Sequence, residues 1–164
     1  MKRYVIGVRV ENKYGVLARI SGLFMRKGFN IDSVASGETE DPNFSRITIA
    51  MRGDDYDCSQ LINQLRKLFN VKQVQLLEEG ASVERELMLI KVKNTPENRN
   101  EIITAAEVYR AKIIDYTTEA MCVEVTGEPA KIKAFIEVMK PLEIIEMCRT
   151  GVVSLQRGGH IMEE

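Results

Sequence analysis

The sequence of 164 residues predicts an α+β fold made of two small βαββαβ domains. Segments with a two-residue hydrophobic period alternate with segments of three- and four-residue period, and both halves show the same order. Residues 78–82, which have no periodicity, separate the two halves. We therefore expect one domain over residues 1–80 and a second over residues 81–164 that ends in a C-terminal tail.

The first half opens with a strand, because large and β-branched residues occupy alternate positions over residues 4–10. Residues 12–15 have the composition of a turn, and an apolar helical stripe begins at Val16. Gly28 is expected to end that helix. The remaining expected strands cover residues 30–38, 46–51 and 71–77, and the second helix carries its apolar stripe over residues 58–69.

The second half repeats this order. After a strand over residues 86–93, Thr95 is expected to cap a helix whose first residue is Pro96, because that position needs no N–H group. Further strands are expected at residues 112–116, 121–126 and 142–147, with the last helix over 132–139. The halves share this pattern but little residue identity, so we interpret them as two domains of one architecture.

This element order is that of ferredoxin-like domains, in which two helices cover one face of a four-stranded antiparallel sheet. The other sheet face and the edge strands are then expected to lack cover. A second copy of the same sheet is one way to cover an edge, so we expect self-association.

Composition and charge exclude several classes of function. Hydrophobic residues make up 45% of the chain, and 23 Lys and Arg nearly cancel 24 Asp and Glu to leave a net charge of −1. Nucleic-acid binding is disfavoured, because it depends on an excess of cationic side chains. With His160 as the single histidine, neither a histidine-based triad nor a multi-histidine metal site is expected.

The cysteines indicate a reducing compartment. Cys58, Cys122 and Cys148 are widely spaced, odd in number and without a C-x-x-C pair, so we expect buried thiols in the cytoplasm. No apolar stretch reaches the roughly 18 residues of a membrane span, and no secretory signal is apparent. The protein is therefore not expected at a membrane.

Three functions are compatible with a βαββαβ unit. RNA binding is disfavoured because the expected third strand, residues 46–51, has no aromatic residue on which a base can stack. Metal carriage is disfavoured because the loop at residues 11–15 has no cysteine. The third possibility is that this loop binds a small ligand.

The loop has the chemistry of an anion site. A loop that contains Gly15 and runs into a helix exposes backbone N–H groups at the positive end of the helix dipole, and Asn12 adds an amide. Residues 28–31 of a partner subunit could offer strand carbonyls to an ammonium group, so a zwitterionic amino acid would match. Alternatively, Asn12 and Gly15 form only a turn and a helix start, which is common.

The residues of this loop and of several later segments resemble a known family. Residues 11–20, Glu-Asn-Lys-Tyr-Gly-Val-Leu-Ala-Arg-Ile, resemble the start of an ACT domain, a regulatory module that binds amino acids. Together with further segments, the chain is similar over essentially its whole length to the regulatory small subunits of acetolactate synthase. The further segments are residues 22–24, 26–31, 41–42, 45–49, 83–92, 113–115 and 149–158.

The resemblance implies a protein without its own catalytic site. It implies a homodimer that binds and activates a large catalytic subunit of branched-chain amino-acid biosynthesis and confers feedback inhibition by valine. Thiamine diphosphate, Mg²⁺ and FAD are then expected on the catalytic subunit, with no cofactor or metal in this chain. A free-standing amino-acid sensor with another partner is the main alternative, and an enzyme of unrecognised type is another.

The resemblance also implies an effector site. Asn12 and Gly15 correspond to residues of that site, and Val16 and Leu17 correspond to its backbone N–H donors. Asn30 and Ile31 correspond to a contribution from the second subunit. The complete expected valine site is Asn12, Gly15, Val16, Leu17, Asn30 and Ile31.

Three other features have simpler explanations. Residues 54–57, Asp-Asp-Tyr-Asp, are expected to form an acidic first helical turn and not a cation site. Arg149 and Arg157 either contact the catalytic subunit or belong to a solvated tail. His160 is expected in a disordered tail.

Overall fold

The computed structural model describes residues 1–162, which form two compact units. Unit 1 combines Met1–Val83 with the C-terminal segment that begins at Gly151, and unit 2 comprises Glu84–Thr150. The expected second domain, residues 81–164, includes this C-terminal segment, whereas residues 151–162 pack within unit 1. Residues 163–164, the end of the expected tail, lie outside the described residues.

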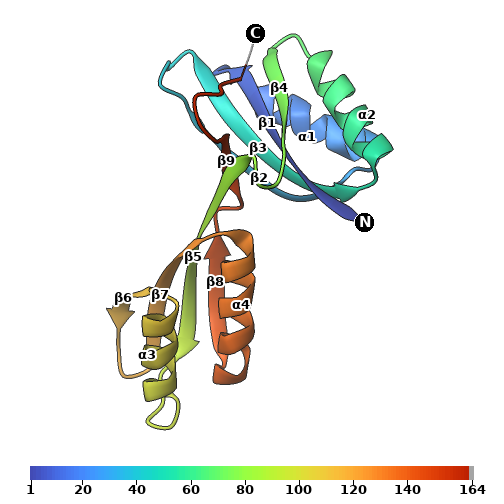
Figure 1. Ribbon diagram of the computed structural model, residues 1–164. Helices are drawn as coiled ribbons and strands as arrows, with labels where there is room; N and C mark the ends of the chain where they lie inside the picture. The colour runs from blue at the N-terminus through green and yellow to red at the C-terminus, as the bar shows by residue number, and fades with distance from the viewer. Residues whose placement is uncertain (163–164) are drawn as a thin grey trace. The chain divides into compact units, whose positions relative to one another are not determined.

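Unit 1 contains a four-stranded antiparallel sheet in the order β2-β3-β1-β4, with both helices on one face (Figure 1). Its strands are β1 (Lys2–Glu11), β2 (Asn30–Glu38), β3 (Phe44–Gly53) and β4 (Val71–Leu77), and its helices are α1 (Val16–Lys27) and α2 (Asp55–Arg66). The predicted βαββαβ order is confirmed. The edges of this sheet are β2 and β4.

The core of unit 1 lies between the sheet and its helices. Ile6 lies opposite Ile49 and Val8 opposite Ile47, and all four side chains point toward the helices and are fully buried. Most of the predicted helical stripes contribute to this core, but Phe69 is 79% exposed because α2 ends before it. Alternate apolar residues of β1 and β3 therefore face the helices, while Val5 and Ala50 between them are buried against the opposite face.

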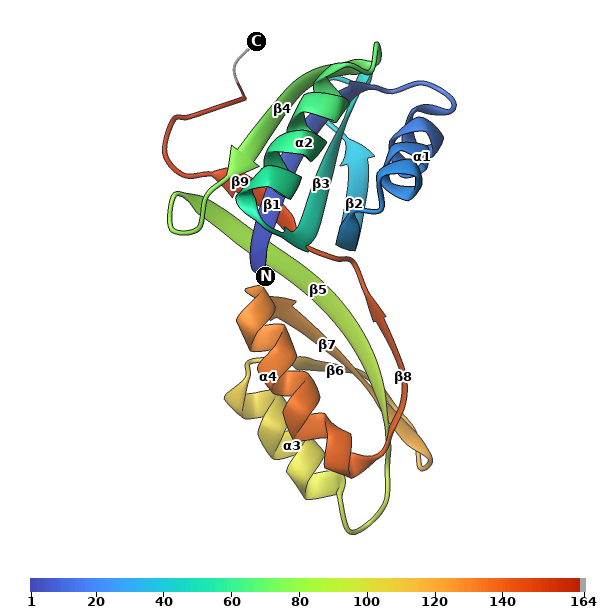
Figure 2. The ribbon, with the colours of Figure 1, turned by 90° about the vertical axis from the view of Figure 1, so that its right-hand side faces the viewer.

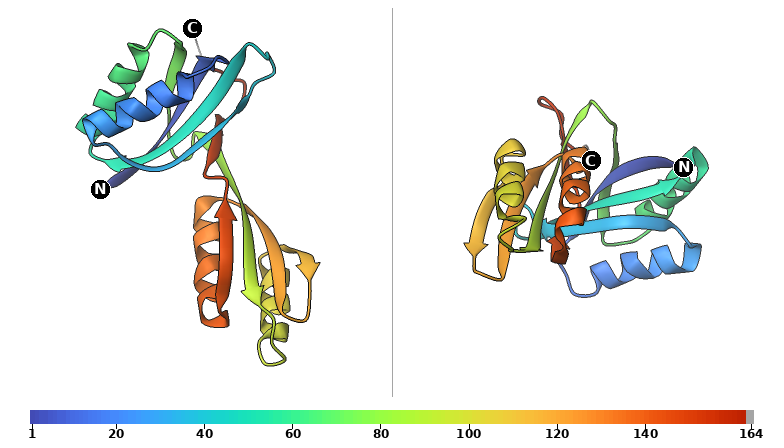
Figure 3. Two further views of the ribbon diagram at one scale, coloured as in Figure 1. Left: turned by 180° about the vertical axis from the view of Figure 1, so that it is seen from behind. Right: turned by 90° about the horizontal axis from the view of Figure 1, so that it is seen from below.

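The opposite face of this sheet, which we call the helix-free face, is not bare. Val152 of the C-terminal segment packs against Val5, Ala50 and Leu77 in a small buried cluster. Beyond it, β9 (Val153–Gln156) pairs with β5, and Met162 lies close to Gly7 of β1. Figure 3 shows this C-terminal segment, in dark red, beside the strands of unit 1. The expectation that this face lacks cover is wrong for unit 1, because Val152 buries apolar surface there.

Unit 2 has the same architecture. Its strands are β5 (Ser82–Lys93), which begins in unit 1, β6 (Lys112–Tyr116), β7 (Ala120–Gly127) and β8 (Ile144–Arg149), and its helices are α3 (Arg99–Val108), α4 (Pro129–Met139) and the 3-10 turn η1 (Lys140–Leu142). The order is β6-β7-β5-β8, and α3 and α4 lie side by side on one face (Figure 2). Met88, Ile90, Val123 and Phe135 are fully buried between the sheet and the helices.

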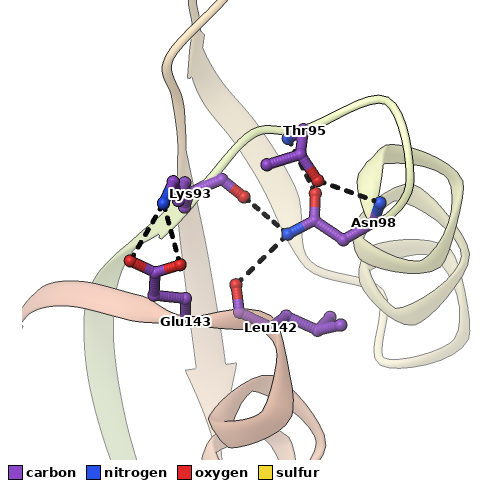
Figure 4. Close-up of polar contacts among 5 residues, drawn as sticks. All are labelled: Lys93, Thr95, Asn98, Leu142 and Glu143. Carbon is purple, nitrogen blue, oxygen red and sulfur yellow. Dashed lines mark hydrogen bonds and ion pairs between the residues drawn. The ribbon is translucent and has the colours of Figure 1, made fainter.

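Helix α3 begins three residues later than predicted. The Thr95 N–H donates to Asn98 Oδ1 at 2.8 Å, and the Asn98 N–H donates to Thr95 Oγ1 at 3.3 Å (Figure 4). The Asn98 amide also donates to the carbonyls of Lys93 and Leu142, so Asn98 joins the end of β5 to η1. These contacts form a separate turn, and the helix starts at Arg99 instead of Pro96.

The thiols differ in burial, and Cys122 is only partly buried. Cys58 is buried as expected, and burial raises the pKa of its thiol. Cys148 is exposed, because it lies opposite Leu89 on the face of the unit 2 sheet that no helix covers. The expectation of a buried thiol is wrong for Cys148.

Candidate functional site

The loop between β1 and α1 leads into a helix whose N-cap residue makes no side-chain capping hydrogen bond. Gly15, the N-cap residue, adopts φ 79° and ψ −4°, a left-handed conformation that side chains disfavour. A Cβ atom at this position would meet no atom within 4 Å, so the space beside Gly15 is open. No side chain among residues 1–162 caps α1, and its first turn holds no acidic residue.

The backbone N–H groups of the first turn of α1 lie at this end of the helix. The Gly15 carbonyl accepts the N–H of Arg19 at 3.0 Å, so the helical ladder begins at this residue. The N–H groups of the first turn, including those of Val16 and Leu17, therefore have no partner within the helix. With the helix dipole, they favour an anion such as a carboxylate. Val16 contributes only its backbone, because its side chain is buried, whereas Leu17 is 47% exposed.

Asn12 is held next to this space by the β2-β3 hairpin. Its backbone N–H donates to the Asn43 carbonyl at 2.8 Å, and its side-chain Nδ2 donates to the Pro42 carbonyl at 3.1 Å. Nδ2 also lies 3.5 Å from Oε2 of Glu38, at the end of β2. The sequence analysis missed Glu38, because no local pattern shows that the end of β2 folds back to Asn12.

The carboxylate nearest in sequence to this loop is engaged elsewhere. Glu11 lies 2.8 Å from Lys72 Nζ and 3.0 Å from Lys13 Nζ, and it accepts a hydrogen bond from Asn70 Nδ2 at 2.9 Å. Hydrogen bonds from Lys72, Lys13 and Asn70 lower the pKa of Glu11 to about 2. Glu11 is therefore ionised and paired with its own cations.

Asn30 and Ile31 lie at the other end of α1. The helix closes at Gly28, whose N–H donates to the Phe24 carbonyl at 3.0 Å, and β2 begins at Asn30. Because α1 has 12 residues, its two ends lie about 18 Å apart. Asn30 is exposed and Ile31 packs against the core. Within one chain, the structure thus does not bring these two residues to Asn12 and Gly15.

The acidic stretch at the start of α2 has a structural role. Asp54 accepts the Asp57 N–H at 2.8 Å, and Asp57 accepts the Asp54 N–H at 3.3 Å. This reciprocal capping box confirms the predicted acidic first turn. The described residues contain no cluster of three or more His, Cys, Asp or Glu side chains that could hold a metal ion. No helix among residues 1–162 has the length and apolar character of a membrane span.

The C-terminal residues also depart from the sequence expectations. Arg149 forms a two-bonded ion pair with the buried Glu86, with Nε to Oε1 at 2.6 Å and Nη2 to Oε2 at 3.1 Å. Hydrogen bonding to Glu86 raises the pKa of Arg149. This side chain therefore does not belong to a solvated tail, and because it is 42% exposed, its contact with the catalytic subunit stays a prediction. His160 lines a cavity on unit 1.

Comparisons with known proteins agree with this architecture. A family model described as an AHAS small subunit-like ACT domain matches residues 6–73, and one described as the small subunit of acetolactate synthase matches residues 85–158. The probable acetolactate synthase small subunit of Archaeoglobus fulgidus is 47% identical over 95% of this chain and 98% of its own length. The acetolactate synthase small subunit of Mycolicibacterium smegmatis is 46% identical, over 94% of this chain and 91% of its own.

A solved structure shows the same fold. The crystal structure of the small subunit of acetolactate synthase from Thermotoga maritima is 37% identical and aligns with a TM-score of 0.89. The alignment covers 98% of this chain and 100% of that one. The chain therefore belongs to the acetolactate synthase small-subunit family, and its first domain is an ACT domain.

Proposed function

We propose that this chain is the non-catalytic regulatory subunit of acetolactate synthase. It binds the large catalytic subunit and raises its activity, and valine bound at the ACT domain inhibits the assembled enzyme. The observation that carries the proposal is the uncapped start of α1 at Gly15, with open space beside Gly15 and Asn12 nearby. Relatives 46–47% identical over nearly the whole chain support the choice of partner enzyme.

The groups at this site suit a zwitterionic amino acid. The ligand's carboxylate accepts the free N–H groups of the first turn of α1. Its ammonium group needs acceptors, and the Glu38 carboxylate near Asn12 is one. A small apolar side chain then lies near Leu17, which is half exposed. Such a pocket distinguishes valine from alanine by about 1–3 kcal/mol and from leucine or isoleucine only weakly.

A homodimer completes the site through β2. This strand is an edge of the sheet, and its middle residue is Val34. If two β2 strands pair antiparallel about Val34, Asn30 of the partner subunit lies opposite Glu38, which is close to Asn12. Pairing also covers an otherwise open edge. The two groups of predicted site residues, separated within one chain, then meet between subunits.

Regulation follows from this shared site. Valine that bridges two subunits stabilises one arrangement of the dimer over another, and the two arrangements differ in how they bind or activate the catalytic subunit. A coupling free energy of about 1–3 kcal/mol is enough for a 5- to 150-fold effect. The chain itself supplies no cofactor, and we place thiamine diphosphate, Mg²⁺ and FAD on the catalytic subunit of a cytoplasmic enzyme.

Reconstitution tests this proposal. Purified chain is added to an acetolactate synthase catalytic subunit, and acetolactate formation is measured with and without valine. We expect the chain to raise activity and valine to lower it only when the chain is present. Absence of both effects contradicts the proposal, and valine binding without activation identifies an amino-acid sensor with another partner.

A further inference from the structure

A row of polar residues crosses the helix-free face of the unit 1 sheet. In the strand register, Gly37 of β2 lies opposite Arg46 of β3, Arg46 opposite Arg9 of β1, and Arg9 opposite Gln73 of β4. Opposite residues in antiparallel strands share a face, so two guanidinium groups and an amide lie side by side. The absence of a side chain at Gly37 leaves room beside Arg46.

These side chains are incompletely satisfied. Arg9 Nε, Arg46 Nε and Gln73 Oε1 are buried and have no hydrogen-bond partner among residues 1–162, and Gln73 is only 8% exposed. Arg9 lies over the Phe44 ring at 4.2 Å, and Arg46 Nη2 donates to the Ser154 carbonyl at 3.0 Å. Buried polar groups without partners are costly and uncommon, so such a group needs an explanation.

The two guanidinium groups also carry like charges on neighbouring strands. Like charges directly opposite on neighbouring strands destabilise a sheet. Among residues 1–162, neither Arg9 nor Arg46 forms an ion pair with a carboxylate. Burial lowers the pKa of Arg46, and the charge of Glu40, which lines the same cavity, acts in the opposite direction. Among the described lining residues, one carboxylate therefore stands against two guanidinium groups, and the site can accept a further anion.

A cavity of about 430 Å³ lies over this row. Its floor includes Arg9, Arg46 and Gln73, with Thr39 and Glu40 at one side. The C-terminal segment closes it with Gln156, Gly158 and residues 160–162, and Gln75 Nε2 donates to Gln156 Oε1 at 2.6 Å. All these residues belong to unit 1.

We propose that this cavity binds a phosphate group, either as inorganic phosphate or as a small phosphate monoester. A carboxylate has two oxygens and matches one guanidinium in two-bonded geometry, whereas a phosphate has three acceptor oxygens and satisfies both arginines. The Gln73 and Gln75 amides can rotate to donate to the same group. The cavity volume leaves room for an organic substituent. This site is on the opposite sheet face from α1, and its assignment does not rest on the proposed function.

Calorimetric titration of the full chain tests this site. The probes are inorganic phosphate and glycerol phosphate, at matched ionic strength. Arg9→Gln is the principal variant, because the Arg9 side chain contacts the Phe44 ring but forms no hydrogen bond with residues 1–162, and its loss relieves the like-charge contact with Arg46. Arg52→Gln is the matched control, since Arg52 lies on β3 but pairs with Asp32. Thermal unfolding without phosphate checks that both variants fold.

We expect phosphate to bind the unmodified chain with one site per chain and the Kd to rise about tenfold or more in Arg9→Gln, with no change in Arg52→Gln. Tighter binding of glycerol phosphate than of phosphate identifies a monoester as the ligand, and equal binding identifies free phosphate. Absence of binding by both probes, or equal weakening in both variants, overturns the proposal.

Discussion

The two helices of the ACT domain begin in opposite ways. Helix α2 starts at Asp54 with a reciprocal capping box and two acidic residues in its first turn. Helix α1 starts at the left-handed Gly15 with neither a side-chain cap nor an acid, and the nearby Glu11 is engaged by Lys13, Lys72 and Asn70. One helix end is satisfied within the chain, and the other is available for an external anion. This difference is our reason for proposing the start of α1 as the ligand site.

The largest expected effect comes from giving α1 an acid of its own. Gly15→Asp places a carboxylate at the expected position of the valine carboxylate, so we expect the Kd for valine to rise about 100-fold or more. Calorimetry measures this change. Gly80→Asp is the control, because Gly80 is also left-handed (φ 83°) with open space around it but lies far along the chain from α1. Unchanged valine binding in Gly15→Asp would show that the site is elsewhere.

Removing the cap from α2 gives the next effect. Asp54→Ala breaks the capping box, which is expected to lower the free energy of unfolding by about 1 kcal/mol, within a range of 0.5–2. Urea unfolding measures it, and valine affinity should stay the same. If Asp54→Ala were as stable as the unmodified chain, the capping box would not stabilise α2, and the two helix starts would not differ in stability.

A smaller effect is expected for Asn12→Ala. Its amide is held by the Pro42 carbonyl next to the free N–H groups, and loss of one hydrogen bond to the ligand should weaken valine binding about 2- to 10-fold. Asn43→Ala in the same hairpin is the control, since the Asn43 side chain bonds to Asp41. Equal losses of valine affinity in the two variants would indicate that the conformation of the hairpin, and not the Asn12 amide, determines valine binding.

The smallest effect concerns Glu11. Its pKa is lowered to about 2 from the ordinary 4.5, so the folded state gains stability that is present above pH 4.5 and is lost as the pH falls toward 2. Glu11→Gln lacks this dependence, and its unfolding free energy should change less between pH 5 and pH 2, a window set by the two pKa values. Urea unfolding at several pH values measures the slopes. Parallel slopes would mean that Glu11 is not tightly paired.

The sequence predicts what depends on local pattern. Alternation in β1 and β3 and the stripe from Val16 to Leu23 follow from burial on one face, which neighbouring residues reveal. The αL conformation at Gly15 follows from turn chemistry in the same way. The residues proposed for the site at both ends of α1 could therefore be named from sequence and resemblance, and their role stays a prediction.

Features that depend on distant partners were not predictable. The pairing of Arg9 with Arg46 requires the strand register, and Arg149 with Glu86 requires two strands 63 residues apart. Val152 covers the helix-free face through residues that are remote in sequence. The late start of α3 depends on Asn98, whose amide contacts Leu142. Sequence spacing gives no information about these contacts, except that alternation along each strand places Arg9 and Arg46 on the face away from the helices.

The central claim is that one valine lies between Gly15 of one subunit and Asn30 of the other, and mixed dimers test it most directly. Gly15→Asp disables the loop half of the site. Asn30→Trp fills the β2 half with a bulky ring at an exposed position. Each variant alone, shown by sedimentation to be dimeric, should bind no valine.

In a dimer of one Gly15→Asp chain and one Asn30→Trp chain, one site combines both substitutions and the other combines two unmodified halves. We predict that calorimetry on the purified mixed dimer shows one valine per two chains. Absence of binding by the mixed dimer, or normal binding by the Asn30→Trp homodimer, would contradict a site shared between subunits.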